Sequence, residues 1–170
     1  MEKLSLLHEK IESCKQAIKI NPDDAEAYYI LGDAYYMSGR YHDAIEPFKQ
    51  AIRIKPDDAE AHCNLGRTYC GLDRYQEAID AFKQAIRIKP DYALAHYALG
   101  IAYGGLGRYQ DAIEACKQAI KIRPDDARVH SNLGVAYLGT GDKGSAIEEY
   151  ELLKTLDAEQ ANKLLTLIGE

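Results

Sequence analysis

The sequence has no long apolar run, no excess of positive charge and no leader-like start. None of its hydrophobic stretches approaches the about 20 residues that a membrane-spanning helix needs. Charges interrupt the opening segment MEKLSLLHEKIE too early for a secretion signal. Lys and Arg total 21 against 27 Asp and Glu, a net charge of −6, whereas binding to nucleic acid needs a basic stripe. We therefore expect a cytoplasmic protein with no nucleic-acid partner and no membrane insertion.

Cysteine is scarce, and its placement does not favour disulfide bonds. Only four cysteines occur among the 170 residues. Cys14 and Cys116 occupy the same position of the repeat described below, and Cys63 and Cys70 lie seven residues apart on one predicted helix. Seven helical residues rise about 10.5 Å, which exceeds the reach of a disulfide. We expect reduced thiols, as is usual in the cytosol.

Proline is also rare, with five in the chain, yet four of the five recur at one interval. Pro22, Pro56, Pro90 and Pro124 are 34 residues apart, in the surroundings KQAIKINPDDA, KQAIRIKPDDA, KQAIRIKPDYA and KQAIKIRPDDA. Self-similarity at this period is typical of an array of helix pairs. Such an array buries a continuous core between neighbouring repeats and offers an extended surface to other macromolecules.

Units that begin at Ala25, Ala59, Ala93 and Ala127 share a fixed pattern. The first unit carries Tyr28, Leu31, Gly32, Tyr35, Ala44, Phe48, Ala51 and Pro56. This pattern resembles the tetratricopeptide repeat. Three units depart from it by placing His62, His96 or His130 where the family usually has tryptophan. The fourth unit drifts to Tyr150, Leu153 and Ala158, as expected of a terminal repeat.

The resemblance implies an all-α fold, an α-solenoid in which antiparallel helix pairs form a right-handed superhelix. We expect one continuous domain of ten helices without strands. Its predicted parts are an N-terminal half-repeat helix at 1–24, repeats at 25–58, 59–92, 93–126 and 127–160, and a C-terminal capping helix at 157–170.

Local signals place the ends of these helices. Position 15 of the units holds Gly39, Asp73, Gly107 and Gly141, the residue types that a left-handed position after a helix selects. Asp24, Asp58 and Asp126 are predicted N-caps. Asp157 with Gln160 predicts the start of a last helix. That helix is expected to bury Ala161, Leu164, Leu165 and Ile168.

Several motifs suggest chemistry, but their context favours structural roles. The glycine-rich segments 104–107 and 139–145 follow no predicted strand, so they indicate turns and not phosphate-binding loops. The repeated histidines lie near Cys63 and Cys70, yet they recur one whole unit apart, which favours packing over zinc ligation. We expect no catalytic residues, no metal site and no cofactor.

A second stripe on the first helix of each unit, about 120° from the packing stripe, is the candidate binding surface. In the family that it resembles, this stripe lines a concave groove that holds peptides. The candidate residues are Glu26, Tyr29, Asp33, Tyr36, Asn64, Arg67, Tyr97, Ile101, Arg128 and Asn132. Tyr29 and Tyr97 stand outside the packing pattern. Asn64 and Asn132 resemble part of an asparagine ladder that some members use to hold a peptide backbone.

The sequence therefore predicts a non-enzymatic scaffold that binds a protein or peptide segment in its concave groove. Glu26 and Asp33 favour a basic stretch in the partner, and Leu94 with Ile101 favours an apolar anchor. One alternative is a self-assembling structural protein that uses its terminal helices, with weak self-association through apolar Leu4, Leu6 or Ile11. Another is a regulatory subunit of a larger complex.

Overall fold

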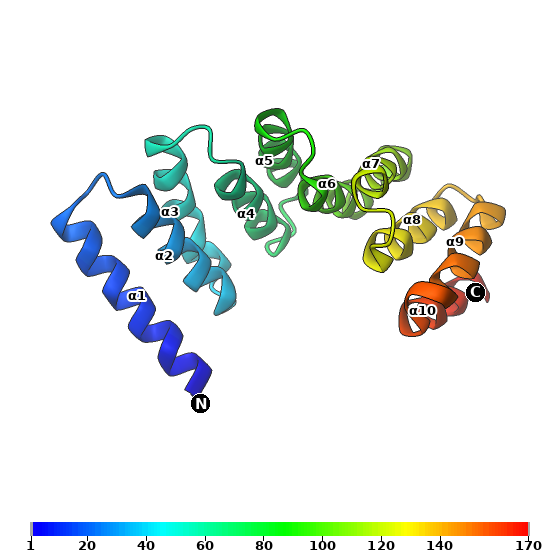
Figure 1. Cartoon of the computed structure of the whole chain (residues 1–170), viewed down its shortest axis with the longest axis horizontal. Coiled ribbons are helices and arrows are strands. Elements are labelled where there is room, and N and C mark those ends of the chain that lie inside the picture. Colours follow the sequence, from blue (N-terminus) through cyan, green and yellow to red (C-terminus); the bar gives the residue numbers. More distant parts are fainter. Residues whose placement is uncertain (1, 170) are drawn as a thin grey trace. The chain divides into compact units, whose positions relative to one another are not determined.

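The computed structural model describes residues 2–169, with side chains from residue 6 onward, and this range consists of helices and short turns (Figure 1). The helices are α1 (Glu2–Ile20), α2 (Ala25–Met37), α3 (Tyr41–Ile54), α4 (Ala59–Cys70), α5 (Tyr75–Ile88), α6 (Ala93–Gly105), α7 (Tyr109–Ile122), α8 (Ala127–Gly139), α9 (Lys143–Leu156) and α10 (Ala158–Gly169). The predicted all-α solenoid of ten helices is confirmed over the described residues. Among these helices, none combines the length and apolar character that crossing a bilayer requires.

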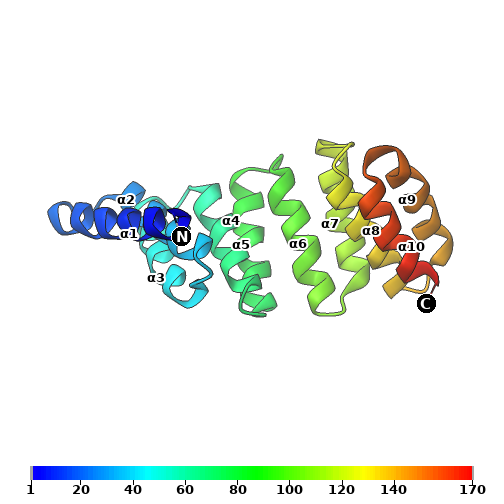
Figure 2. The same ribbon diagram turned by 90° about the horizontal axis from the view of Figure 1, so that it is seen from below.

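Contacts between helices group the chain into two compact units, one ending at Pro90 and the other beginning at Asp91. In unit 1, α2 packs on α3 and α4 packs on α5, so that each repeat is a helix hairpin (Figure 2). The first helices α2 and α4 also contact each other, whereas no Cα atoms of α3 and α5 lie within 8 Å of each other among the described residues. Unit 2 has the same arrangement, with α6 contacting α8. In each unit, the side chains of the first helices that point away from the second helices share one face, which we call the inner face.

The helix ends follow the local signals in the sequence. The carboxylate of Asp24 accepts a hydrogen bond from the backbone N–H of Ala27 at 3.0 Å, and Asp58 accepts two at 3.0 Å. Asp126 accepts one from the N–H of Arg128 at 3.1 Å. Each first helix is followed by a left-handed residue. The φ angles are 73° at Gly39, 57° at Asp73, 70° at Gly107 and 80° at Gly141. The predicted caps and left-handed turns are therefore confirmed.

In the first three repeats, close approach of the two helices depends on a glycine in the first helix. A Cβ atom on Gly32 would lie 2.9 Å from the ring of Phe48, and one on Gly66 would lie 2.6 Å from the ring of Phe82. Both separations are shorter than carbon atoms tolerate, so only glycine fits. In the fourth repeat, Leu164 of α10 packs on the glycine instead. A Cβ atom on Gly134 would lie 2.5 Å from the Leu164 side chain.

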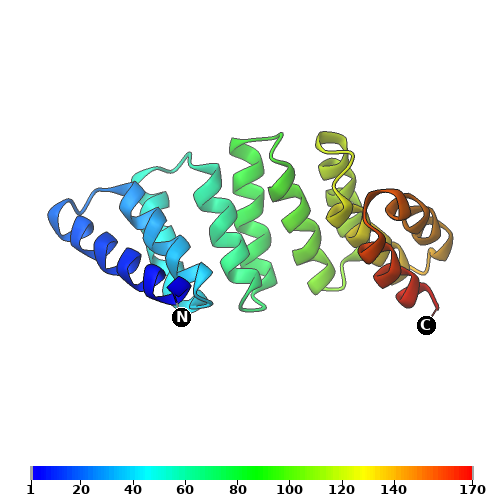
Figure 3. The same ribbon diagram turned by 60° about the horizontal axis from the view of Figure 1, so that its bottom comes forward.

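The last helix packs against α8 and α9 in unit 2 (Figure 3). Asp157 caps it by accepting hydrogen bonds from the N–H groups of Glu159 and Gln160 at 3.0 and 3.1 Å. Ala161, Leu164 and Ile168 are buried against α8 and α9. The expectation that Leu165 shares this buried face is wrong, since 44% of it is exposed. The buried stripe follows i, i+3 and i+7, and Leu165 lies about 100° around the helix from Leu164.

The first helix packs on α2 in the way that a second helix packs on the next repeat. Ile11 and Cys14 are buried there, with 4% and 6% of their surfaces exposed. The expectation that Ile11 is available for self-association is therefore wrong, because α2 covers it. Leu6 is exposed, and the side chain of Leu4 lies outside the described residues.

The cysteines are buried or half-buried, and no disulfide joins them in the described part of the chain. Burial raises the pKa of the Cys70 thiol to about 11 and that of Cys116 to about 12. At neutral pH both thiols are protonated and poorly nucleophilic. The cysteines therefore serve as small apolar residues of the core.

We predict that Leu164→Ala lowers the free energy of unfolding of unit 2 by about 2–4 kcal/mol, because it leaves a cavity against Gly134. Leu165→Ala removes the same atoms from the neighbouring exposed position and is expected to cost less than about 1 kcal/mol. Urea unfolding of the full chain measures both. Equal losses would show that α10 does not pack on α8 through Leu164.

Candidate functional site

The unit 1 candidates form one stripe across the inner face. Glu26, Tyr29, Asp33 and Tyr36 follow one another on α2 at spacings of three or four residues, which places them on one side of the helix. Asn64 and Arg67 come from α4, which contacts α2. Glu26 is exposed and the other five candidates are half-buried. The structure therefore brings the six together on the inner face.

These polar residues are bonded to one another across α2 and α4. The amide Nδ2 of Asn64 donates a hydrogen bond to the Tyr29 hydroxyl at 2.9 Å. Nη1 of Arg67 donates to Oδ1 of Asn64 at 3.0 Å, and the guanidinium lies 4.8 Å from the centre of the Tyr36 ring. The sequence does not reveal this network, because its members are 35 residues apart and occupy adjacent positions of successive repeats.

The two tyrosines of unit 1 also pack against the core. The ring of Tyr29 meets that of Phe48 edge-on, with centroids 5.9 Å apart. The ring of Tyr36 lies 5.4 Å from that of Tyr41. The expectation that Tyr29 stands outside the packing is therefore wrong, because Phe48 reaches it beside the close helix approach at Gly32. Truncating Tyr29 to alanine would disturb the fold as well as the surface.

Carboxylates give this surface a negative field. Burial, together with the negative charges of Glu60, Asp33 and Asp58, raises the pKa of Tyr29 to about 12. Asp33 also lies 3.8 Å from the ammonium of Lys10 on α1. A cation that approaches Tyr29 would therefore meet several carboxylates.

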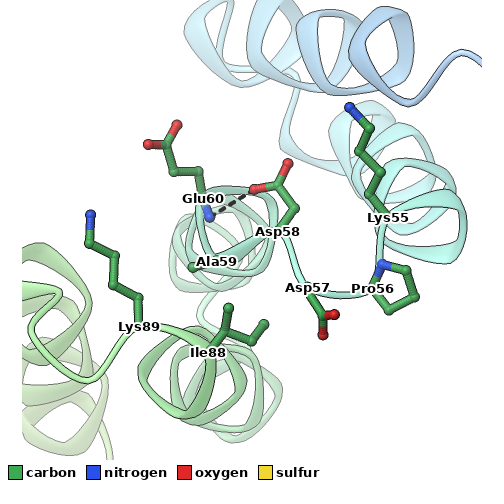
Figure 4. A pocket seen from close by; sticks show the side chains of 8 residues that line it. All are labelled: Lys55, Pro56, Asp57, Asp58, Ala59, Glu60, Ile88 and Lys89. Atoms are coloured by element: carbon green, nitrogen blue, oxygen red, sulfur yellow. Dashed lines mark hydrogen bonds between the residues drawn. The ribbon is translucent and has the colours of Figure 1, made fainter.

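An open depression lies at the start of α4 (Figure 4). Its lining consists of Lys55, Pro56, Asp57, Asp58, Ala59, Glu60, Ile88 and Lys89. Lys55 and Lys89 lie on opposite sides of Glu60 in Figure 4, and the Asp58 carboxylate is occupied in capping α4. An equivalent depression occurs at residues 122–128 in unit 2, where Arg128 replaces Glu60.

The inner face of unit 2 is more apolar. Ile101 on α6 and Val135 on α8 hold the same position in successive repeats, and each is 40% exposed. The candidates did not include Val135, although its repeat position could have identified it. The guanidinium of Arg128 lies 5.4 Å from the centre of the Tyr97 ring. The inner face of unit 2 thus holds four of the candidates, which are Tyr97, Ile101, Arg128 and Asn132.

Asn132 corresponds to Asn64 two repeats earlier, but its surroundings differ. Tyr97 is equivalent to Tyr29, yet no hydrogen bond joins Tyr97 to Asn132 within the described residues. Val135 stands where unit 1 has Arg67. The polar network that Asn64 closes in unit 1 is therefore not repeated around Asn132, which is half-buried.

The repeated histidines make structural hydrogen bonds. Nε2 of His62 donates to the carbonyl oxygen of Pro56 at 3.0 Å. Nε2 of His130 donates to that of Pro124 at 2.7 Å, and its Nδ1 lies 2.7 Å from a carboxylate oxygen of Glu149. Both histidines thus tie the first helix of a repeat to the loop before it.

Comparison with known proteins identifies the repeat. Models of the tetratricopeptide repeat match residues 11–39, 32–73, 66–107, 103–141 and 127–160. A crystal structure of MamA is 33% identical, with 89% of each chain covered and a TM-score of 0.83. TTC0263, a thermophilic protein with this repeat from Thermus thermophilus, is 26% identical over 92% of this chain and 87% of that chain, with a TM-score of 0.73.

YrrB, described as a protein of this repeat class with an unusual peptide-binding site, shares the fold. It is 19% identical, the match covers 97% of this chain and 86% of that chain, and the TM-score is 0.83. No curated protein sequence matches the chain significantly.

We predict that Tyr29→Phe destabilises unit 1 by about 0.5–1.5 kcal/mol at pH 8, because the Asn64 amide loses its acceptor. The pKa of Tyr29 in the folded protein, about 12, lies above its ordinary value of 10.0. The stability that depends on the neutral hydroxyl is therefore present below pH 10.0 and lost as the pH rises through about 12.

Urea unfolding of the parent protein and of Tyr29→Phe, at pH 8 and again above about pH 11, measures the difference between their free energies of unfolding. This difference is expected to shrink at the higher pH. Tyr97→Phe serves as the control, since no hydrogen bond links its hydroxyl to Asn132 within the described residues. Equal losses for the two variants at the lower pH would contradict the role of the network.

Proposed function

The chain belongs to the tetratricopeptide repeat family, and we propose that it is a non-enzymatic scaffold that captures a segment of another protein on its inner faces. The observation that carries this proposal is the exposure of Ile101 on α6 and Val135 on α8, which hold the same position in successive repeats. Neither is buried in the core, and contiguous exposed apolar surface marks sites of protein–protein interaction.

The inner face of unit 1 selects a basic stretch. Glu26 and Glu60 are exposed, and Asp33 lies beside Tyr29. A lysine or arginine of the partner gains from these carboxylates and from the nearby aromatic rings. Arg67 and Asn64 hold Tyr29 and Tyr36 in place through the network described above.

The inner face of unit 2 supplies an apolar anchor. Ile101 and Val135 form its exposed part, and Tyr97 adds a half-buried ring beneath Arg128. The side-chain amide of Asn132 offers both a donor and an acceptor to the main chain of an extended segment. Affinity is expected to come chiefly from the apolar and aromatic contacts.

The test begins with a partner identified on the immobilised chain and then purified. We expect Asp33→Lys to weaken its binding about tenfold or more and to reduce the salt dependence, since a carboxylate facing the basic stretch is replaced by a cation. Ile101→Asp is expected to weaken binding to a similar degree by placing a charge on the apolar anchor site. Isothermal titration calorimetry measures both.

Asp80→Lys makes the same charge change as Asp33→Lys on an exposed position of α5, outside the inner face. Its affinity is expected to match that of the parent protein. If Asp80→Lys weakened binding as much as Asp33→Lys, or if Ile101→Asp had no effect, the partner would bind elsewhere and the inner-face assignment would fail. Circular dichroism of each variant verifies that its helix content is retained.

A further inference from the structure

A small cavity lies between the beginnings of α6 and α8, inside unit 2. Its volume is about 170 Å³, and it is more enclosed than the depressions at the loops. It is lined by Ala93, Leu94, Tyr97, Arg123, Asp126, Arg128 and Val129. A cavity of about 150 Å³ can hold a benzene ring. The space is therefore large enough for one large side chain, with Leu94, Tyr97 and Val129 as its apolar walls and charged residues on the remaining side.

Positive side chains outnumber negative ones at this cavity, with Arg123 and Arg128 against Asp126. The carboxylate of Asp126 accepts hydrogen bonds from Nε and Nη2 of Arg128 at 2.9 and 2.6 Å. These bonds hold the pKa of Asp126 below its usual value, and the nearby charge of Arg123 lowers it further. Asp126 is thus fully engaged by Arg128 and by capping α8. Arg123 has no ion-pair partner within the described residues, which leaves one positive charge in excess beside the apolar walls of the cavity.

Unit 1 shows that this character is not a general property of the repeat. The residues at the corresponding positions, 68 earlier, are Ala25, Glu26, Tyr29, Lys55, Asp58, Glu60 and Ala61. Three carboxylates and one cation therefore stand where unit 2 has one carboxylate and two cations. Glu26 replaces Leu94, and Glu60 replaces Arg128. The same backbone position is acidic in unit 1 and apolar with a net positive charge in unit 2.

We propose that the unit 2 cavity accepts a large apolar side chain of the partner, and that an acidic residue next to that side chain pairs with Arg123. This inference rests on the proposed function, since it names the chemistry that the captured segment presents to unit 2. The planar guanidinium of Arg123 matches a carboxylate with two parallel hydrogen bonds. Tyr97, Leu94 and Val129 supply the apolar walls.

The test uses two synthetic dipeptides on the full chain, N-acetyl-phenylalanyl-aspartic acid amide and its isosteric asparagine counterpart. Backbone amide shifts in NMR titrations report where each one binds and how tightly. We expect saturable shifts at Leu94, Tyr97 and Val129, and binding about three- to tenfold tighter for the aspartic acid probe. Arg123→Gln is expected to abolish that difference while it leaves binding of the asparagine probe unchanged.

Lys55→Gln is the matched control, because Lys55 holds the position of Arg123 in unit 1. It is expected to leave both titrations unchanged. Arg128→Glu converts the cavity toward the charge of unit 1 and is expected to reverse the preference between the probes. Equal affinity for the two probes, shifts confined to unit 1, or an undiminished preference in Arg123→Gln would each overturn the proposal.

The dipeptide titrations and the partner-binding experiment can succeed or fail separately. A preference for the acidic probe that depends on Arg123 supports the cavity even if Asp33→Lys and Ile101→Asp leave the captured partner unaffected. Conversely, a partner lost in those two variants supports the inner-face function even if the dipeptides show no preference.

Discussion

The contact between the two helices of a repeat, closed over a glycine, is the constraint on which the surfaces depend. At Gly32 and Gly66 the phenylalanine rings of α3 and α5 lie where a side chain would otherwise stand. This closeness fixes how each first helix is rotated about its own axis. Once one side of α2 is held against Phe48, its opposite residues are committed to the inner face. The chemistry of that face is therefore free to vary while the backbone stays constant.

The sequence predicts those features that depend on local rules. Asp58 and Gly39 are examples, because an N-cap and a left-handed residue are determined within a few residues of chain. The identity of the helix-pair array and the face on which Asp33 or Ile101 stands follow from the 34-residue period. These features needed no knowledge of how neighbouring repeats contact each other.

Features that depend on contacts between helices were missed or predicted wrongly. Ile11 is covered because α1 packs on α2, and Tyr29 joins the packing because Phe48 extends past Gly32. The bond between Asn64 and Tyr29 joins different positions of successive repeats, so a reading of one repeat at a time does not detect it. Likewise, the cavity beside Arg123 exists only because the starts of α6 and α8 adjoin each other.

The position of Leu164 limits how such an array can grow by duplication. In the earlier repeats, the residue that packs on the glycine belongs to the same hairpin, so a copied unit brings its own. In the fourth repeat that residue comes from α10, and α10 covers the side of α8 and α9 on which another first helix would pack. Repeats copied upstream of α8 would leave this ending intact, whereas one inserted between α9 and α10 would separate Leu164 from Gly134. Gain or loss of repeats among relatives is accordingly expected in the middle of the array, with the pairing of α8 and α10 inherited as a block.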